Sequence, residues 1–177
     1  FSARIPVGWN CYAAVDRNNV GRKGVLHFST SRDPQGLTAA NMPWNSWNFM
    51  EGIGVLGAWS GIFTGGMPAL SYMSAAQYCA QKLAPDLGNK LRNMRIERIL
   101  DRPDWAELGQ IEMMQAGYPP GSFESTAALL EVTYDENGVR LRHKLRLATM
   151  RMAASPSMWN AFNDIDYRAP EAEFTAW

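Results

Sequence analysis

Residues 52–81 read GIGVLGAWSGIFTGGMPALSYMSAAQYCAQ, a run of 30 residues without a charged side chain between Glu51 and Lys82. An α-helix rises about 1.5 Å per residue, so about 20 of these residues would cross the core of a bilayer. Six glycines and Pro68 lower the hydropathy of the run. Both residue types are nevertheless more frequent in membrane helices than in other helices. The run therefore predicts one glycine-rich transmembrane helix within residues 51–81.

Three glycines of this run, Gly57, Gly61 and Gly65, are spaced four residues apart. They form two overlapping GxxxG motifs, so all three lie on one face of the predicted helix. Such a face lets a second helix come close enough for backbone van der Waals contact, which stabilises helix pairs in lipid. We therefore expect the three glycines to form a packing interface with another subunit.

Aromatic residues stand before the run and in its last part. Amphipathic rings prefer the headgroup level of a bilayer, where one end of the ring is apolar and the other is hydrated. Four aromatic residues are therefore expected at the membrane interface: Trp44, Trp47, Tyr72 and Tyr78.

The start of the run also contains the pattern GxGxxG, at Gly52, Gly54 and Gly57. A dinucleotide site uses these glycines for a tight turn, for close approach to pyrophosphate and for helix packing on a strand. Here the preceding residues make a poor buried strand, and no acidic residue follows before Asp86 to bind a ribose hydroxyl. We therefore predict no cofactor, and a nucleotide-dependent enzyme remains an alternative.

Two apolar stretches before the run, residues 7–15 and 25–29, surround a polar segment and predict a β-hairpin. Residues 33–48 are rich in Pro, Asn and Gly, which is typical of a connector.

A pair of helices is predicted after the run. Pro85 would open the first helix, in which Leu87, Leu91 and Met94 keep the i, i+4, i+7 spacing. Asp101 has the side chain of an N-cap for a second helix, which would begin near Pro103 and end at Gly117.

Apolar residues alternate in 130–134 before Asn137-Gly138, and residues 139–147 alternate between apolar and basic side chains after it. This pattern predicts a hairpin with one apolar and one basic face. Cations two residues apart on a strand lie about 6.6–7 Å apart, so such a face could follow phosphates or lipid headgroups. The alternative is a solvated face that protects an edge strand. The predicted basic face consists of Arg140, Arg142, Lys144 and Arg146.

Seventeen basic residues balance seventeen acidic residues, so the net charge gives no reason to expect nucleic acid as a partner. Cys11 and Cys79 stand far apart in unlike contexts, which argues against a disulfide scaffold. The spacings HxxE, HExxH and CxxC do not occur, so no metal site is predicted. No GxSxG motif accompanies His27 or His143, and no catalytic residue is predicted.

Together these patterns predict an α+β protein with a single glycine-rich transmembrane helix flanked by small polar segments. Four segments are expected: a polar segment with the first hairpin (1–50), the membrane helix (51–81), the helix pair with the basic hairpin (82–150), and an extended tail containing aromatic residues (151–177). The chain begins at Phe1 rather than Met, so we expect a processed form or a fragment.

The expected function is that of a non-catalytic accessory subunit, which contacts lipid and packs its glycine face against other subunits of a membrane complex. Electron-transport assemblies of the mitochondrial inner membrane are the first expected location, and the thylakoid is the second. The alternatives are a soluble enzyme, which would use Gly52–Gly57 or a histidine, and a soluble interaction module that buries the uncharged run against a partner.

Overall fold

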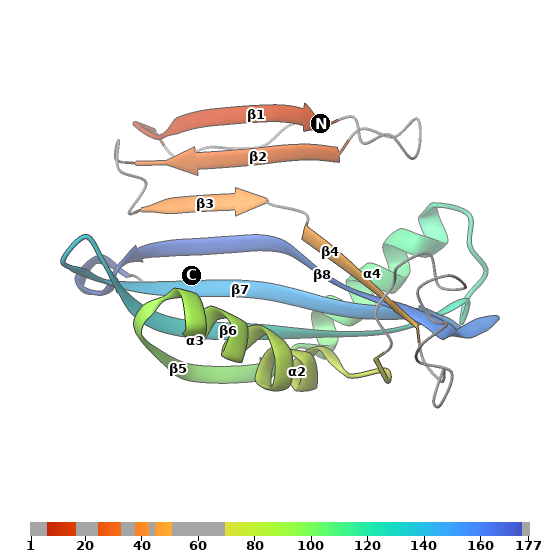
Figure 1. Cartoon of the computed structure of the whole chain (residues 1–177). Coiled ribbons are helices and arrows are strands. Elements are labelled where there is room, and N and C mark those ends of the chain that lie inside the picture. The colour runs from red at the N-terminus through yellow and green to blue at the C-terminus, as the bar shows by residue number, and fades with distance from the viewer. Residues whose placement is uncertain (1–6, 17–24, 33–37, 43–44, 51–69, 175–177) are drawn as a thin grey trace.

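A computed structural model describes residues 7–16, 25–32, 38–42, 45–50 and 70–174. These residues form one antiparallel sheet of eight strands in the order β1-β2-β3-β8-β7-β6-β5, and β4 also pairs with β8 (Figure 1). The strands are β1 (Asn10–Asp16), β2 (Val25–Ser31), β3 (Ala39–Met42), β4 (Asn45–Met50), β5 (Arg92–Asp101), β6 (Phe123–Glu136), β7 (Val139–Met152) and β8 (Ser155–Pro170).

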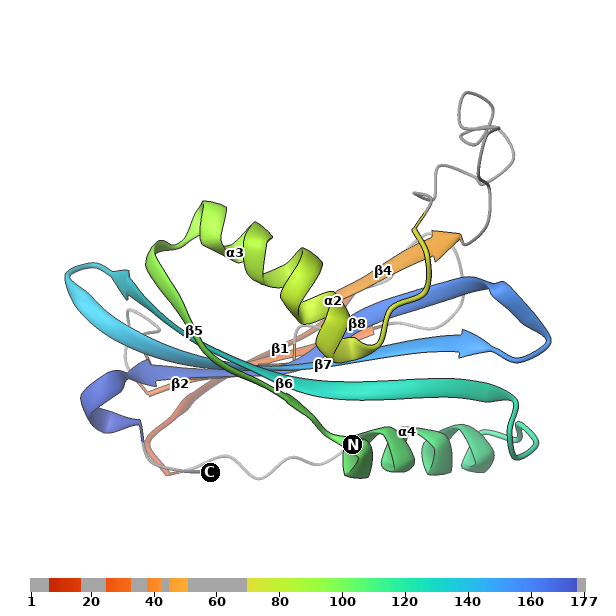
Figure 2. The same cartoon turned by 90° about the horizontal axis from the view of Figure 1, so that it is seen from below.

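Helices lie on both faces of this sheet. One continuous helix consists of α2 (Ala75–Tyr78), the π-helical turn η1 (Cys79–Leu83) and α3 (Ala84–Lys90). It lies on one face, and α4 (Pro103–Gln115) lies on the other (Figure 2). A short 3-10 turn, η2 (Glu171–Glu173), follows β8. We call the two faces the core face and the α4 face.

The core face is apolar because β6 and β7 alternate in register. Leu130 pairs with Leu145 and Ala128 with Leu147, and all four side chains are buried. Alternate residues of a strand point to the same face, so one apolar surface extends over both strands. The helix covers this surface with a buried set that comprises Ala75, Tyr78, Cys79 and Leu83.

Aromatic residues close one side of this core. The rings of Phe49 and Trp159 stack at 4.5 Å, and Tyr78 meets Trp159 edge to face at 6.0 Å. The indole Nε1 of Trp159 donates to the carbonyl of Leu70 at 2.7 Å. The start of the helix is fixed by a capping box at Ser74, whose Oγ accepts from the backbone of Gln77.

The prediction of a transmembrane helix over residues 51–81 is wrong. Within the described ranges, no helix is long and apolar enough to cross a membrane. The end of the uncharged run is instead the first part of the helix on the sheet, where burial of Ala75, Tyr78 and Cys79 accounts for its apolar character. The expected α+β class is corrected with it, since the structure is mostly β-sheet. The description of the chain as a transmembrane subunit rested on that helix and is corrected as well.

The first predicted helix after the run is partly wrong. The helix already starts at Ala75, and Pro85 lies within it. It ends at Lys90, and the backbone of Leu91 is extended, so Met94 belongs to β5. Leu87, Leu91 and Met94 nevertheless all pack against the same core. The spacing of these three residues thus indicated that they share one apolar core, and not that they lie on one continuous helix.

The second predicted helix is confirmed as α4, and Gly117 follows it with a positive φ of 96°. Its N-cap is Arg102, however, and Asp101 is the last residue of β5. Both predicted hairpins are confirmed, one as β1 and β2 and the other as β6 and β7. The connector expected over residues 33–48 is wrong, because β3 and β4 lie within it. Residues 155–170 of the expected tail form β8, which pairs along both of its edges.

We expect Gly138→Ala to destabilise the protein by about 1–2 kcal/mol, because Gly138 adopts a φ of +78° that costs a residue with a Cβ about this much. A Cβ at Gly138 would meet nothing within 4 Å, so the loss comes from the backbone conformation alone. Gly109→Ala in α4 is the matched control. It also has nothing within 4 Å and should stabilise by about 0.5–1 kcal/mol. Urea unfolding of both variants measures these changes, and equal effects would contradict the assigned turn.

We expect Cys79 to resist alkylation in the folded protein, while the exposed Cys11 reacts. Burial, assisted by Asp101, raises the pKa of the Cys79 thiol from 9.0 to about 12. Because the pKa of Cys79 is raised in the folded protein, burial of the neutral thiol stabilises the fold fully below pH 9. This stabilisation is lost as the pH rises toward 12, where the thiol ionises. Mass spectrometry after iodoacetamide treatment at pH 8 measures the labelling. Rapid labelling of both cysteines would contradict the burial of Cys79.

Candidate binding surface

The predicted basic residues lie on the α4 face of β7. This strand pairs with β6 on one side and with β8 on the other, so it is not an edge strand. Arg140 donates to Asp135 at 3.1 Å and to Thr133 at 2.6 Å. Lys144 Nζ lies 4.9 Å from the centre of the Phe174 ring, and Arg146 lies over the Trp105 ring at 5.7 Å. The basic row is therefore engaged by neighbouring side chains and does not form an open track for phosphates.

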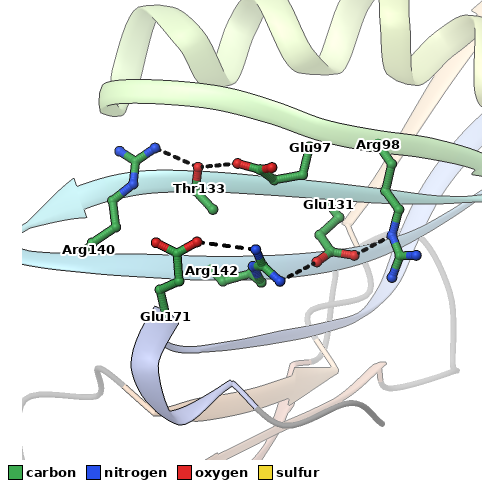
Figure 3. Close-up of polar contacts among 7 residues, drawn as sticks. All are labelled: Glu97, Arg98, Glu131, Thr133, Arg140, Arg142 and Glu171. Carbon is green, nitrogen blue, oxygen red and sulfur yellow. Dashed lines mark hydrogen bonds and ion pairs between the residues drawn. The ribbon is translucent and has the colours of Figure 1, made fainter.

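A buried carboxylate lies at the centre of this face. The side chain of Glu131 is only 3% exposed, and Arg98 Nε donates to it at 2.6 Å. Arg142 approaches the same carboxylate at 3.5 Å and also reaches Glu171 at 3.2 Å. Figure 3 shows Arg98 and Arg142 pointing toward Glu131 from opposite sides. Two cations thus offset the cost of burying the Glu131 charge.

A second chain of hydrogen bonds runs beside this cluster. Arg140 donates to the Thr133 hydroxyl, and that hydroxyl donates to Glu97 at 2.8 Å (Figure 3). Thr133 is buried, so both of its polar contacts replace water. The two chains connect β5, β6 and β7 across the α4 face. We interpret the cluster as a structural network, since its charges satisfy one another.

Helix α4 presents an apolar stripe to solvent next to this network. Its inner side contacts β6, where Ser125 Oγ donates to the carbonyl of Ala106 at 3.3 Å. Its outer side carries Leu108, which is 54% exposed, and Ile111, which is 38% exposed, followed by the exposed Met114. These three residues are spaced at intervals of three, so they share one side of the helix. Exposed apolar residues gathered in this way are typical of interaction sites.

Further apolar residues lie after the end of α4 and at the neighbouring ends of β6 and β7. The exposed ring of Tyr118 meets Phe123 edge to face at a centroid distance of 5.0 Å. Phe123 is paired in register with the exposed Met152. We call Leu108, Ile111, Met114, Tyr118, Phe123 and Met152 the α4 patch.

His143 lies on the core face beside Asp166. Its Nε2 is 3.9 Å from Asp166 Oδ1, and both atoms are buried without a hydrogen-bond partner. Arg168 reaches Glu136 at 3.1 Å and Tyr134 at 3.4 Å nearby. Burial is the main reason that the pKa of Tyr134 is raised. Among the described residues, no Ser, Thr or Cys is hydrogen-bonded to Nε2 of His143.

The other predicted site residues are dispersed. Tyr72 and Tyr78 lie in the aromatic cluster around Trp159, where Arg151 covers the Tyr72 ring at 4.3 Å. Trp47 belongs to β4, and His27 belongs to β2. The described residues contain no group of three or more metal-binding side chains. The predicted glycines Gly52, Gly54, Gly57, Gly61 and Gly65, together with Trp44, lie outside the described residues.

Two features of this surface were missed from the sequence. Glu131 stands at an odd position of β6 among apolar even positions, so the alternation already placed it on the face opposite the core. The α4 segment has apolar residues on all sides, namely Trp105, Leu108, Ile111, Met113 and Met114. That distribution is unusual for a helix that is covered on one side only. It could have indicated from the sequence that α4 exposes apolar residues.

Comparison of the chain with protein-family models, with curated proteins and with solved structures finds no significant match.

We expect Glu131→Ala to destabilise the protein by about 2 kcal/mol, because it leaves two neighbouring guanidinium groups without their shared anion. The loss is reduced because both arginines can reach water. Glu124→Ala is the matched control on the same strand. Glu124 is 52% exposed and bonds to Arg151 at 2.6 Å, so its loss should cost less than about 1 kcal/mol. Denaturant unfolding compares the two variants, and equal losses would contradict the central role of Glu131.

Proposed function

We propose that this chain is a non-catalytic interaction module, which binds a basic amphipathic helix of a partner protein on the α4 patch. The observation that carries this proposal is that α4 is apolar on both of its sides, although the sheet covers only one of them. A helix that is apolar all round is normally covered all round. The outer side of α4 therefore has the character of a surface that is buried in an assembly.

The charge of α4 defines the chemistry of the partner. The helix contains Asp104, Glu107 and Glu112 and no basic residue. Asp104 is paired with Arg102 at 2.6 Å, whereas Glu107 and Glu112 form no ion pair with other described residues. Acidic side chains beside an apolar stripe favour a partner with lysine or arginine next to its own apolar residues.

Glu112 supports the same conclusion. It lies in the last turn of α4, where the partial negative charge of the helix end disfavours an acidic side chain. No basic residue in that turn compensates for it. Glu112 therefore lowers the stability of the helix. Binding surfaces often carry residues that are not the locally preferred ones, so a role in recognition would explain Glu112.

The mode of binding follows from the shape of the patch. Leu108, Ile111 and Met114 form a stripe that extends about 9 Å along the helix, given the rise of about 1.5 Å per residue. Tyr118, Phe123 and Met152 add apolar side chains after the end of α4 and at the neighbouring ends of β6 and β7. An extended apolar stripe of this kind suits a partner helix that presents apolar residues at i, i+3, i+4 and i+7.

The proposal is tested by calorimetric titration with two helical peptides, both with leucine at those spacings, one with lysine and one with glutamate at the remaining positions. The lysine peptide should bind, and 0.5 M salt, roughly a tenfold excess over low-salt buffer, should weaken its binding. Combined Leu108→Ser and Ile111→Ser substitutions should reduce its affinity at least about tenfold, because two buried apolar anchors are lost.

Ile96→Ser is the matched control, since Ile96 is a comparably exposed isoleucine, 48% exposed, on β5. This variant should bind the lysine peptide like the original chain. Equal binding of both peptides, or an unchanged affinity in the Leu108 and Ile111 variant, would refute the proposal. Sedimentation of the chain alone adds one more outcome: self-association that Ile111→Ser abolishes would assign the patch to a second copy of this chain instead.

A further inference from the structure

A polar hollow lies where the start of β5 meets the turn between β6 and β7. It has a volume of about 430 Å³ and is lined by Asn93, Met94, Arg95, Asp135 and Arg140. An adjoining hollow of about 350 Å³ shares Asn93, Asp135 and Arg140 and adds Arg92, Asn137 and Gly138. We call the two together the turn pocket. Each of the two hollows falls in the lower part of the range of small-molecule sites, about 300–1,000 Å³.

Asn93 holds the walls of this pocket together. It adopts a left-handed φ of 52° at an irregularity in the pairing of β5 with β6. In this conformation its side chain donates to Asp135 at 2.6 Å, and its carbonyl accepts from Arg140 at 2.9 Å. Asn137 also has a positive φ of 51°, as the two-residue turn between β6 and β7 requires. The conformation of Asn93 has no such turn to explain it, and strained residues of this kind occur at binding sites.

The charges of the turn pocket do not balance. Three guanidinium groups, those of Arg92, Arg95 and Arg140, face one carboxylate, that of Asp135, which leaves a net charge of two positive units, three minus one. Asp135 is already committed, since hydrogen bonds from Asn93 and Arg140 lower its pKa. Glu97 joins the same network through Thr133 but does not line the pocket.

Two of these cations remain available for a ligand. The side chains of Arg92 and Arg95 are exposed. Arg92 lies opposite Asp135 in the pairing of β5 with β6, and its charge helps to lower the pKa of that carboxyl. The guanidinium group of Arg95 has no hydrogen bond or ion pair among the residues that the structure describes. This separates Arg95 from the four cations of the basic row, whose partners were described above. A guanidinium group presents paired N–H donors that match two oxygens of an oxyanion.

We propose that the turn pocket binds the phosphate group of a small phosphorylated molecule. The net charge of the pocket matches a phosphate monoester, which carries close to two negative charges at neutral pH, better than it matches a carboxylate with one. Its polar and charged lining suits a small anion and not an apolar ligand. The site is independent of the α4 patch: ten residues of β6, from Ser125 beside α4 to Asp135, span roughly 33 Å.

The test is a titration of the chain with inorganic phosphate at constant ionic strength, followed by the backbone amide signals in NMR spectra. Saturable shifts should be confined to residues 92–95 and 137–140. Acetate, titrated in the same way, should bind at least about fivefold more weakly because it carries half the charge. No saturation, shifts spread over other exposed cations, or equal binding of acetate would each overturn the proposal.

Two substitutions with opposite effects sharpen this test. Arg95→Ala should weaken phosphate binding at least about fivefold, since it removes one of the exposed guanidinium groups. Asp135→Asn should strengthen binding by about twofold or more, because the net charge rises from two to three. A structural role alone would not produce this gain. Lys82→Ala removes an exposed cation on η1 and should leave binding unchanged.

The amide spectra also report whether each variant is folded. If Asp135→Asn unfolds the chain, the result for the Arg95→Ala variant alone tests the proposal, because Arg95 is exposed and its removal should leave the fold intact. Unchanged phosphate affinity in the Arg95→Ala variant would refute the site.

Discussion

The contact between the helix of residues 75–90 and the sheet determines the direction of every side chain in the central strands. Burial of Leu130, Val132, Leu145 and Leu147 beneath this helix fixes which face of β6 and β7 is the core. Because the side-chain repeat of a strand is two residues, the same contact sends Glu131, Thr133 and the basic row to the opposite face. If β7 were shifted by one residue against its neighbours, four cations would be buried under the helix and the leucines would be exposed. Such a shifted register would therefore be much less stable.

This constraint explains why the α4 face is built from paired charges. Once β7 presents a cation at every second position there, these cations need partners, because side chains such as Arg140 and Arg142 are largely buried, with 29% and 31% exposed. Glu131 supplies the anion from the neighbouring strand, and residues distant in sequence, such as Trp105 and Phe174, supply aromatic rings. Leaving any of these cations buried and unpaired would be costly. The network is thus a consequence of the apolar packing on the other side.

The sequence predicted the features that depend on local signals. The turn at Asn137-Gly138, the start of α4 near Pro103 and the hairpin of β1 and β2 all lie within short stretches that carry their own turn or capping residues. β8 could not be predicted in this way, because its stability comes from β7 on one edge and from β3 and β4 on the other. The uncharged run misled for a related reason: burial against a sheet and burial in lipid select the same apolar side chains. The basic row was visible in the sequence, but its partners come from four other elements, β5, β6, α4 and η2.

The two proposed sites lie on surface that belongs neither to the apolar core nor to the charge network. Side chains that face the helix or the charge network have no freedom to recognise a ligand, since moving them would expose apolar surface or separate buried charges. Surface remains available at the two ends of β6, where α4 covers the sheet with only one side and where Arg92 and Arg95 of the turn pocket are exposed. At each end one residue departs from its local preference, Glu112 in the last turn of α4 and Asn93 in the left-handed conformation. Neither residue belongs to the apolar core, and both departures agree with the proposal that these two ends of the sheet bind other molecules.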